Sequence, residues 1–291
     1  MRRLAAVALV AVACGAVAVH AQTLTLAYKT GATYHYTIHM TSNYAVSSGA
    51  INEPAKLDMK AKETVKVNSV DSSGVADVSV MFSDSTMTMT MGNSQSKTTI
   101  TQTQAMFPTL DVKIAADGRV LSVNGTSISA DLSFGVGMGN GIVSAVLPDS
   151  AVKPGDTWSK TYDQPGPLGS GSIRITANSK YLRNEKFHGV QAAVVETKSS
   201  ANIEFTQTLN GQPGAGGGSS LSLNGTTTAD VTSWIDPSAH RLLKTLMNAN
   251  SELTMSMSMG APPGSAVPGM PAGAAGPMTI KGTQTFDLEP A

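Results

Sequence analysis

Apolar and polar side chains alternate along most of this chain with a period of two residues. In the segment 33–40, Tyr34, Tyr36, Ile38 and Met40 fall on one side of the alternation, and polar residues fall on the other. This is the pattern of a β-strand with one buried face, because successive side chains of a strand point to opposite faces. Further strand-like segments are 64–70, 75–82, 173–181, 190–197, 201–209, 221–235, 242–259 and 279–288.

Short segments rich in Asp, Ser, Gly and Pro predict tight turns between several of these strands. The segment 71–74 (Asp-Ser-Ser-Gly) predicts a hairpin, as does Asp117-Gly118 between Ile114 and Val120. Two further turns are expected at 184–189 and 236–238.

Helical signals are confined to one place in the chain. A short helix is expected at 141–146, although glycines nearby weaken it, since each costs about 1 kcal/mol in a helix relative to Ala. The Gly-rich stretches 211–220 and 260–277, and the shorter 92–96, lie between strand signals and predict hairpin loops. We therefore predict an all-β protein with at most one or two short helices.

The two halves of the chain carry related segments. Lys-Thr-Gly-Ala-Thr-Tyr at 29–34 resembles Lys-Pro-Gly-Asp-Thr-Trp at 153–158, and the late segments 112–121 and 232–243 are also related. The spacing of roughly 120 residues is far longer than the ~20–50 residues of solenoid repeats. We predict an internal duplication in which long antiparallel strands form one curved sheet or open barrel. The predicted β domain is 22–291, with halves at about 24–147 and 148–291.

The first residues have the features of a secretory signal peptide. Arg2 and Arg3 precede a run of small apolar residues at 4–19, and Val19-His20-Ala21 places small residues at positions −3 and −1 of a cleavage site. A membrane anchor is the alternative, but the run is shorter than the ~18 residues that a spanning helix needs. We expect 1–21 to be removed and the protein to be exported to the periplasm or the extracellular space.

Cys14 is the only cysteine of the chain. It leaves open a lipid-anchored form, although the apolar run before it is short and Ala11 stands where a lipoprotein signal usually has Leu. Without Cys14, the mature chain has no disulfide, no thiolate metal ligand and no cysteine nucleophile.

The charges of the chain are balanced, with 20 basic and 20 acidic residues. No basic run stands out, so nucleic acid and anionic membrane surfaces are not expected partners. Charged residues make up 14% of the chain, against ~25% in typical soluble domains. Uncharged polar residues take their place, which favours an exported bacterial β protein over a cytosolic enzyme.

Two stripes of alternating methionine, at 86–91 and 254–259, repeat the same pattern with Thr or Ser between the methionines. Three interpretations stay open: a packed core face, the wall of a deformable apolar cavity, and a Cu(I) site, since thioethers are adaptable side chains and soft ligands. Two tryptophans at strand-like positions extend the apolar set. The candidate residues lining an apolar ligand are Met87, Met89, Met91, Met255, Met257, Met259, Trp158 and Trp234.

Residues that commonly carry catalysis or bind metals are sparse. His35 and His39 share a strand face but lie about 13 Å apart along it, too far for one zinc ion bound at ~2.0–2.1 Å. The chain contains no nucleophile elbow, His-Glu-x-x-His, phosphate-loop or dinucleotide motif. We therefore assign no catalytic residue, no metal ligand and no cofactor.

A short motif gives the chain a family resemblance. Gly155-Asp156-Thr157-Trp158 follows Leu147-Pro148, with an Asp-Gly hairpin before it and long Thr- and Ser-rich strands around it. In this layout the chain resembles uncharacterised bacterial exported and lipoprotein families, and the domain-of-unknown-function family DUF6263 in particular. Its plan is also similar to that of periplasmic lipoprotein carriers, in which a curved antiparallel sheet holds acyl chains. The resemblance implies a β-rich exported protein and brings no catalytic motif.

Together these features predict an exported, non-enzymatic protein that binds an apolar ligand or partner, such as a lipid, in the concave face of a sheet. The alternative is a structural envelope protein without a ligand. A Cu(I)-binding protein that uses the methionine stripes, or an unrecognised hydrolase, comes third. An envelope protein is the expected kind of protein partner.

Overall fold

Twelve β-strands account for most of the residues that the computed structural model describes, which are 20–48, 51–92, 97–102, 109–123, 144–165, 172–209, 219–258 and 277–291. The strands are β1 (Thr33–Ser48), β2 (Ile51–Val70), β3 (Ala76–Met91), β4 (Lys97–Gln102), β5 (Leu110–Ile114), β6 (Val120–Val123), β7 (Thr157–Pro165), β8 (Ser172–Phe187), β9 (Val190–Leu209), β10 (Ser219–Asp236), β11 (Arg241–Ser258) and β12 (Met278–Pro290). These residues contain no helix, and hence none that is long and apolar enough to cross a membrane.

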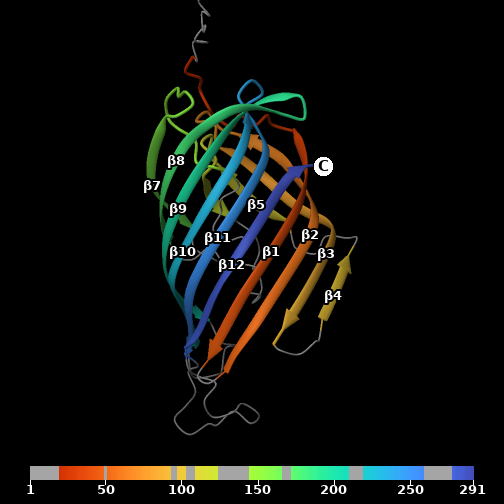
Figure 1. Ribbon diagram of the computed structural model, residues 1–291, viewed down its shortest axis with the longest axis vertical. Helices are drawn as coiled ribbons and strands as arrows, with labels where there is room; N and C mark the ends of the chain where they lie inside the picture. Colours follow the sequence, from red (N-terminus) through yellow and green to blue (C-terminus); the bar gives the residue numbers. More distant parts are fainter. Residues whose placement is uncertain are drawn as a thin grey trace, which may run out of the picture.

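All twelve strands belong to one antiparallel sheet. Its order is β6-β5-β3-β2-β1-β12-β11-β10-β9-β8-β7, and β4 pairs with β3 off this path. The sheet curves strongly (Figure 1), and its end strands β6 and β7 approach each other without a backbone ladder between them in the described residues. The predicted all-β class and the curved sheet of long antiparallel strands are confirmed, and the sheet is not closed into a barrel.

The two halves of the chain meet where β1 pairs with β12, from Tyr36 opposite Pro290 to Ser48 opposite Met278. The β2–β3, β5–β6, β8–β9 and β10–β11 turns all lie at one end of the sheet, called here the turn end. The connections from β1 to β2, β9 to β10 and β11 to β12 lie at the opposite end, called here the loop end.

The two opening segments that suggested a duplication form the same local turn. Gly31 and Gly155 have φ angles of 81° and 99°, which glycine adopts without steric cost. In each segment the N–H after the glycine donates to the carbonyl of the first lysine, so the turn closes just before a strand. The duplication of the whole halves stays a prediction.

The predicted turns at 71–74 and 117–118 separate β2 from β3 and β5 from β6. The turn expected at 184–189 is shorter, because β8 continues to Phe187. The first half of the helix expected at 141–146, the loop at 211–220 except for its last two residues, and nearly all of the loops at 92–96 and 260–277 lie outside the described residues. The described residues 144–146 are not helical.

One face of the sheet is apolar, and it is the concave one, called here the inner face. The main hydrophobic cluster contains Val120 of β6 and Tyr181 of β8, from opposite ends of the strand order, which only the concave side can bring together. In β3 a bulge at Asp84, with a φ of 47°, shifts the register against β2. Val80 before the bulge and Met87 after it therefore face the same side despite their different parity.

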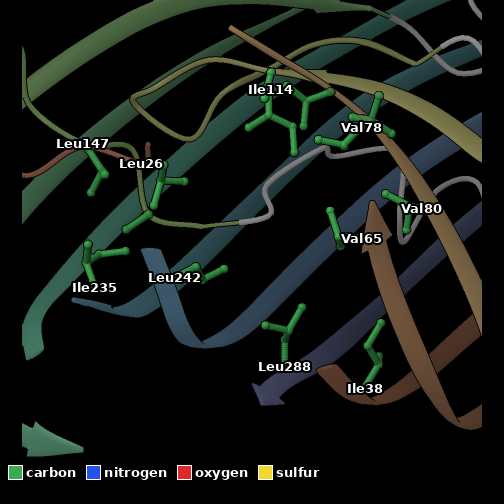
Figure 2. Close-up of a cluster of buried hydrophobic side chains, with 14 of the residues drawn as sticks. Leu26, Ile38, Val65, Val78, Val80, Ile114, Leu147, Ile235, Leu242 and Leu288 are labelled. Atoms are coloured by element: carbon green, nitrogen blue, oxygen red, sulfur yellow. The ribbon is translucent and has the colours of Figure 1, made fainter. Parts of the chain in front are cut away.

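The core fills the turn end of the inner face. The main cluster includes Leu24 and Leu26 from the segment before β1, and Ala145 and Leu147 from the segment before β7. Figure 2 shows Leu26 and Leu147 lying near Ile235 on the inner side of the strands. The turn end of the curved sheet is thus covered by the chain's own segments.

Candidate ligand-binding face

The segment 144–147 lies on the inner face at the turn end, where buried side chains hold its backbone. The N–H of Ala145 donates to Ser233 Oγ at 2.8 Å, and the N–H of Val146 donates to Thr197 Oγ1 at 3.0 Å. Ser179 Oγ donates to the Val146 carbonyl at 3.0 Å. Because these buried polar groups are satisfied by one another, the segment is a fixed cover for this end of the sheet.

Two further clusters continue the inner face toward the loop end. In the described part of the chain, all their members and all the hydrophobic residues packed against them belong to strands. The second cluster comprises Ile173, Ile175, Ala201, Ile203, Leu223 and Leu253, and the third comprises Ala229, Val231, Met247 and Ala249. Apolar clusters therefore occur on the inner face from the turn end toward the loop end, with polar side chains such as Ser199 and Gln284 between them, while the described cover of this face is confined to the turn end.

Small side chains dominate one level of the inner face. Gln284, Ala249, Ala229, Ser199 and Ala177 lie in register across β12 to β8. Except for Gln284, these side chains project only a short distance from the sheet. The strands contribute less bulk to the interior here than at the levels of Met247 or Leu253 on either side.

The methionine stripes both reach the inner face, but they pack in different clusters. Met87 and Met89 are half-buried against the main cluster, and Met255 is half-buried against the second. The remaining stripe residues are Met91, in β3 opposite Ala55; Met257, in β11 opposite Leu221; and Met259, which lies outside the described residues. The stripes therefore do not form one continuous methionine cluster in the described part.

Other methionines of the inner face were missed from the sequence. Met59 of β2 lies between Met87 of β3 and Met40 of β1 in register. Met40 Sδ accepts a hydrogen bond from Gln284 Nε2 at 2.8 Å, so that sulfur is already engaged. The Cu(I) interpretation stays a prediction.

The two tryptophans lie on opposite faces of the sheet. Trp158 faces inward, packs against the main cluster and donates from Nε1 to the Val146 carbonyl at 2.9 Å. Trp234 faces outward, since both of its chain neighbours are fully buried on the inner side. Its ring lies 5.8 Å from Lys244 Nζ, and its Nε1 donates to Glu185. Only Trp158 lines the inner face.

A buried carboxyl group lies among aromatic residues near the turn end. Glu63 of β2 is 7% exposed and lies opposite Tyr36. The rings of Tyr28 and Tyr34 meet edge to face beside it, with centroids 6.0 Å apart. Burial raises the pKa of Glu63 to about 7, and it also raises the pKa of Tyr28 and of Tyr36. Glu63 is therefore the group of this cluster that changes charge near neutral pH.

The histidines of β1 lie on the outer face and are exposed. His35 Nδ1 lies 3.2 Å from Thr64 Oγ1, and His39 Nε2 lies 3.3 Å from Asp58 Oδ2. Within the described ranges, no group of three or more His, Cys, Asp or Glu residues is arranged to hold a metal ion.

Comparison with known proteins finds no family and only distant similarities to solved structures. No family model and no curated protein matches the chain. A structure described as "lipid-protein interactions in lipovitellin" is similar over 90% of this chain, with 11% identity and a TM-score of 0.47; this chain covers 25% of that one. A trimeric, in-vitro folded OmpT, an outer membrane protein from Vibrio cholerae, is similar over 89% of this chain and 100% of its own, with 9% identity and a TM-score of 0.15. At these values no function is transferred.

Proposed function

We propose that the protein binds an apolar ligand, such as a lipid acyl chain, against the inner face of its curved sheet. The observation that carries this proposal is the series of three apolar clusters along the inner face from the turn end toward the loop end. The chain's own described cover, at Leu24, Leu26, Ala145 and Leu147, belongs to the first cluster. The second and third clusters present strand side chains alone in the described residues.

The chemistry of this face suits a flexible hydrocarbon. Burial of a methylene group stabilises a complex by about 0.8 kcal/mol, so an acyl chain of a dozen carbons gains on the order of 10 kcal/mol before ordering costs. Met255 and Met247 lie at this face, and methionine adapts its shape to irregular guests. The polar groups here satisfy one another, as Thr227 and Ser251 do at 3.0 Å, so the face offers little directional recognition.

The proposal is tested on the full-length protein by native mass spectrometry, solvent extraction and titration with N-phenyl-1-naphthylamine, an apolar fluorescent probe. We expect a co-purifying amphiphile and saturable probe binding that a fatty acid displaces. Met255→Gln should weaken probe binding, since Met255 packs against the second cluster. Met81→Gln is the matched control, because Met81 is 36% exposed on the outer face of β3.

Absence of both the amphiphile and saturable binding contradicts the proposal and favours a structural envelope protein. Equal effects of the two methionine variants contradict the assignment of the inner face. Export is part of the same proposal and rests on the signal-like residues 1–21. N-terminal sequencing of the exported protein tests it, with Gln22 as the expected first residue.

A further inference from the structure

The two end strands of the sheet, β6 and β7, are joined by side chains. Lys160 Nζ of β7 lies 2.7 Å from Asp117 Oδ2 in the β5–β6 turn and 2.7 Å from Asp149 Oδ1. Arg119 Nε donates to Asp117 Oδ2 at 2.7 Å, and its guanidinium carbon lies 5.3 Å from the centre of the Tyr162 ring. The line between β6 and β7 is called here the seam, and Lys160, Asp117 and Arg119 are called the latch.

The latch is unusual because it places charge at an inner position of the sheet. The side chains of Lys160 and Asp117 are only 12% and 11% exposed. Burial alone raises the pKa of Asp117, but the hydrogen bond and charge of Lys160, with Arg119, hold that pKa below its usual value. A buried ion pair of this kind adds little net stability over an apolar contact, yet it favours one geometry strongly. The latch therefore specifies a closed seam more than it strengthens the fold.

Among the described residues, the seam lacks the backbone ladder that joins neighbouring strands along the strand order. Neighbouring strands elsewhere along the sheet are joined by backbone ladders, such as the one that runs from Tyr36–Pro290 to Ser48–Met278 between β1 and β12. Parting such a ladder breaks many backbone hydrogen bonds at once. Parting the seam breaks the side-chain contacts of the latch, the packing of the turn and two backbone hydrogen bonds, in which Leu147 and Leu26 N–H donate to the carbonyls of Asp117 and Ala116.

The latch stands between the outside of the molecule and the inner face. Tyr162, which Arg119 covers, packs against the second cluster of the inner face. On the other side, Asp149, Trp158 and Lys160 line a surface groove of about 590 Å³. The Arg119 guanidinium, which reaches from the β5–β6 turn to the Tyr162 ring, thus lies over an aromatic ring that packs against the second cluster.

We propose that the seam between β6 and β7 is the route by which an apolar ligand reaches the inner face, and that the latch holds this route shut. The ligand part of this inference rests on the function proposed above. The opening of the seam does not, since it concerns the contacts that the β5–β6 turn makes with β7 and with the segments that carry Leu26 and Leu147. The latch sets how often the seam opens and leaves the ligand's contacts inside unchanged.

The test compares Lys160→Met with Lys244→Met in the full-length protein. Lys160→Met keeps the apolar stem and removes the charge from the seam. Lys244 is a matched control, because its side chain is 16% exposed and paired with Glu289 and Asp287 on the outer face, away from the seam. Lys160→Met leaves Asp117 without this partner, so the double variant Lys160→Met/Asp117→Asn is included to avoid an uncompensated buried charge.

Two measurements separate the opening from the binding. Hydrogen exchange in 115–123 and 157–163 should become about tenfold faster in both seam variants and stay unchanged in Lys244→Met, because these segments exchange through local opening. Stopped-flow entry and exit of N-phenyl-1-naphthylamine should both become severalfold faster, with Kd altered less than about twofold.

If hydrogen exchange at the seam is as slow in both seam variants as in Lys244→Met, the proposal that the latch holds the seam shut is wrong. If hydrogen exchange becomes faster but the rates of probe entry and exit do not change, the seam is not the route by which the ligand enters. Failure of every variant and of the wild type to bind the probe, together with the absence of a co-purifying amphiphile, overturns the proposed function and with it ligand entry. The exchange data alone still decide whether the seam opens.

Discussion

The buried carboxyl of Glu63 makes the stability of the fold depend on pH, and Glu63→Gln is expected to remove that dependence. Glu63 is 7% exposed on the inner face, between Tyr36 of β1 and Phe82 of β3. Burial penalises its charged form and raises its pKa from 4.5 to about 7. The neighbouring Tyr28 and Tyr36 stay uncharged between pH 4 and 8, since burial raises the pKa of both side chains.

The sign follows from proton binding in the two states. Below pH 4.5 the carboxyl is protonated in both the folded and the unfolded chain, and the full stability is present. As pH rises from 4.5 to about 7, the unfolded chain releases its proton first, so stability is lost; above 7 the loss is constant. A shift of this size, at about 1.4 kcal/mol per pKa unit, corresponds to about 3 kcal/mol.

The assay is urea unfolding of wild type and Glu63→Gln, followed by far-ultraviolet circular dichroism between pH 5 and 8. We expect the variant to gain about 2–3 kcal/mol over the wild type across this range, because glutamine carries no charge to desolvate. Glu53→Gln is the control, since Glu53 is exposed in the same strand and its substitution should not alter the pH dependence. A difference between wild type and Glu63→Gln that is constant with pH, or that shrinks as pH rises, refutes the reasoning.

Three further predictions concern stability. Leu253→Ala removes a fully buried side chain of the second cluster, and urea unfolding should show a loss of about 2–5 kcal/mol. Gly282→Ala places a Cβ against the Asn43 carbonyl and Tyr44, where β12 meets β1; its melting temperature should fall by several degrees, whereas Thr283→Ala on the outer face should change little. Although burial opposes it, hydrogen bonds from Ser238 and Ala239 hold the pKa of Asp236 below its usual value. Asp236→Ala should therefore cost about 1–3 kcal/mol at neutral pH and reduce the loss of stability on acidification, measured by unfolding at pH 3 and 7.

Local signals in the sequence were enough to predict the strand class and several turns. The alternation at 33–40 and the turns at 71–74 and 117–118 all depend on neighbouring residues, and the structure confirms them. The full length of β1 and β2 was not apparent, because inner positions such as Ser42 and Glu63 are polar. A polar residue at an inner position interrupts the alternation while the backbone ladder continues through it.

The candidate site was predicted less completely, for two physical reasons. Trp234 was grouped with Trp158, although the alternation of Val231, Ser233 and Ile235 already places Trp234 on the opposite face. The pairing of Lys160 with Asp117 could not be read from the sequence, because it depends on the sheet curving until its two end strands meet. A lysine between Trp158 and Tyr162 on the apolar side of a strand was the available signal.

The two ends of the inner face use their polar side chains differently. At the turn end its hydroxyl groups, Ser179, Thr197 and Ser233, are used to hold the chain's own segment 144–147. Toward the loop end the hydroxyl groups of Thr227 and Ser251 pair with each other, and the second cluster with its neighbours is aliphatic apart from the thioether of Met255 and the ring of Tyr162. The proposed ligand, placed at the loop end, would therefore meet apolar area and few free donors or acceptors in the described residues. Recognition by area alone selects for length and flexibility more than for functional groups, so acyl chains of similar length should compete with one another irrespective of their headgroups.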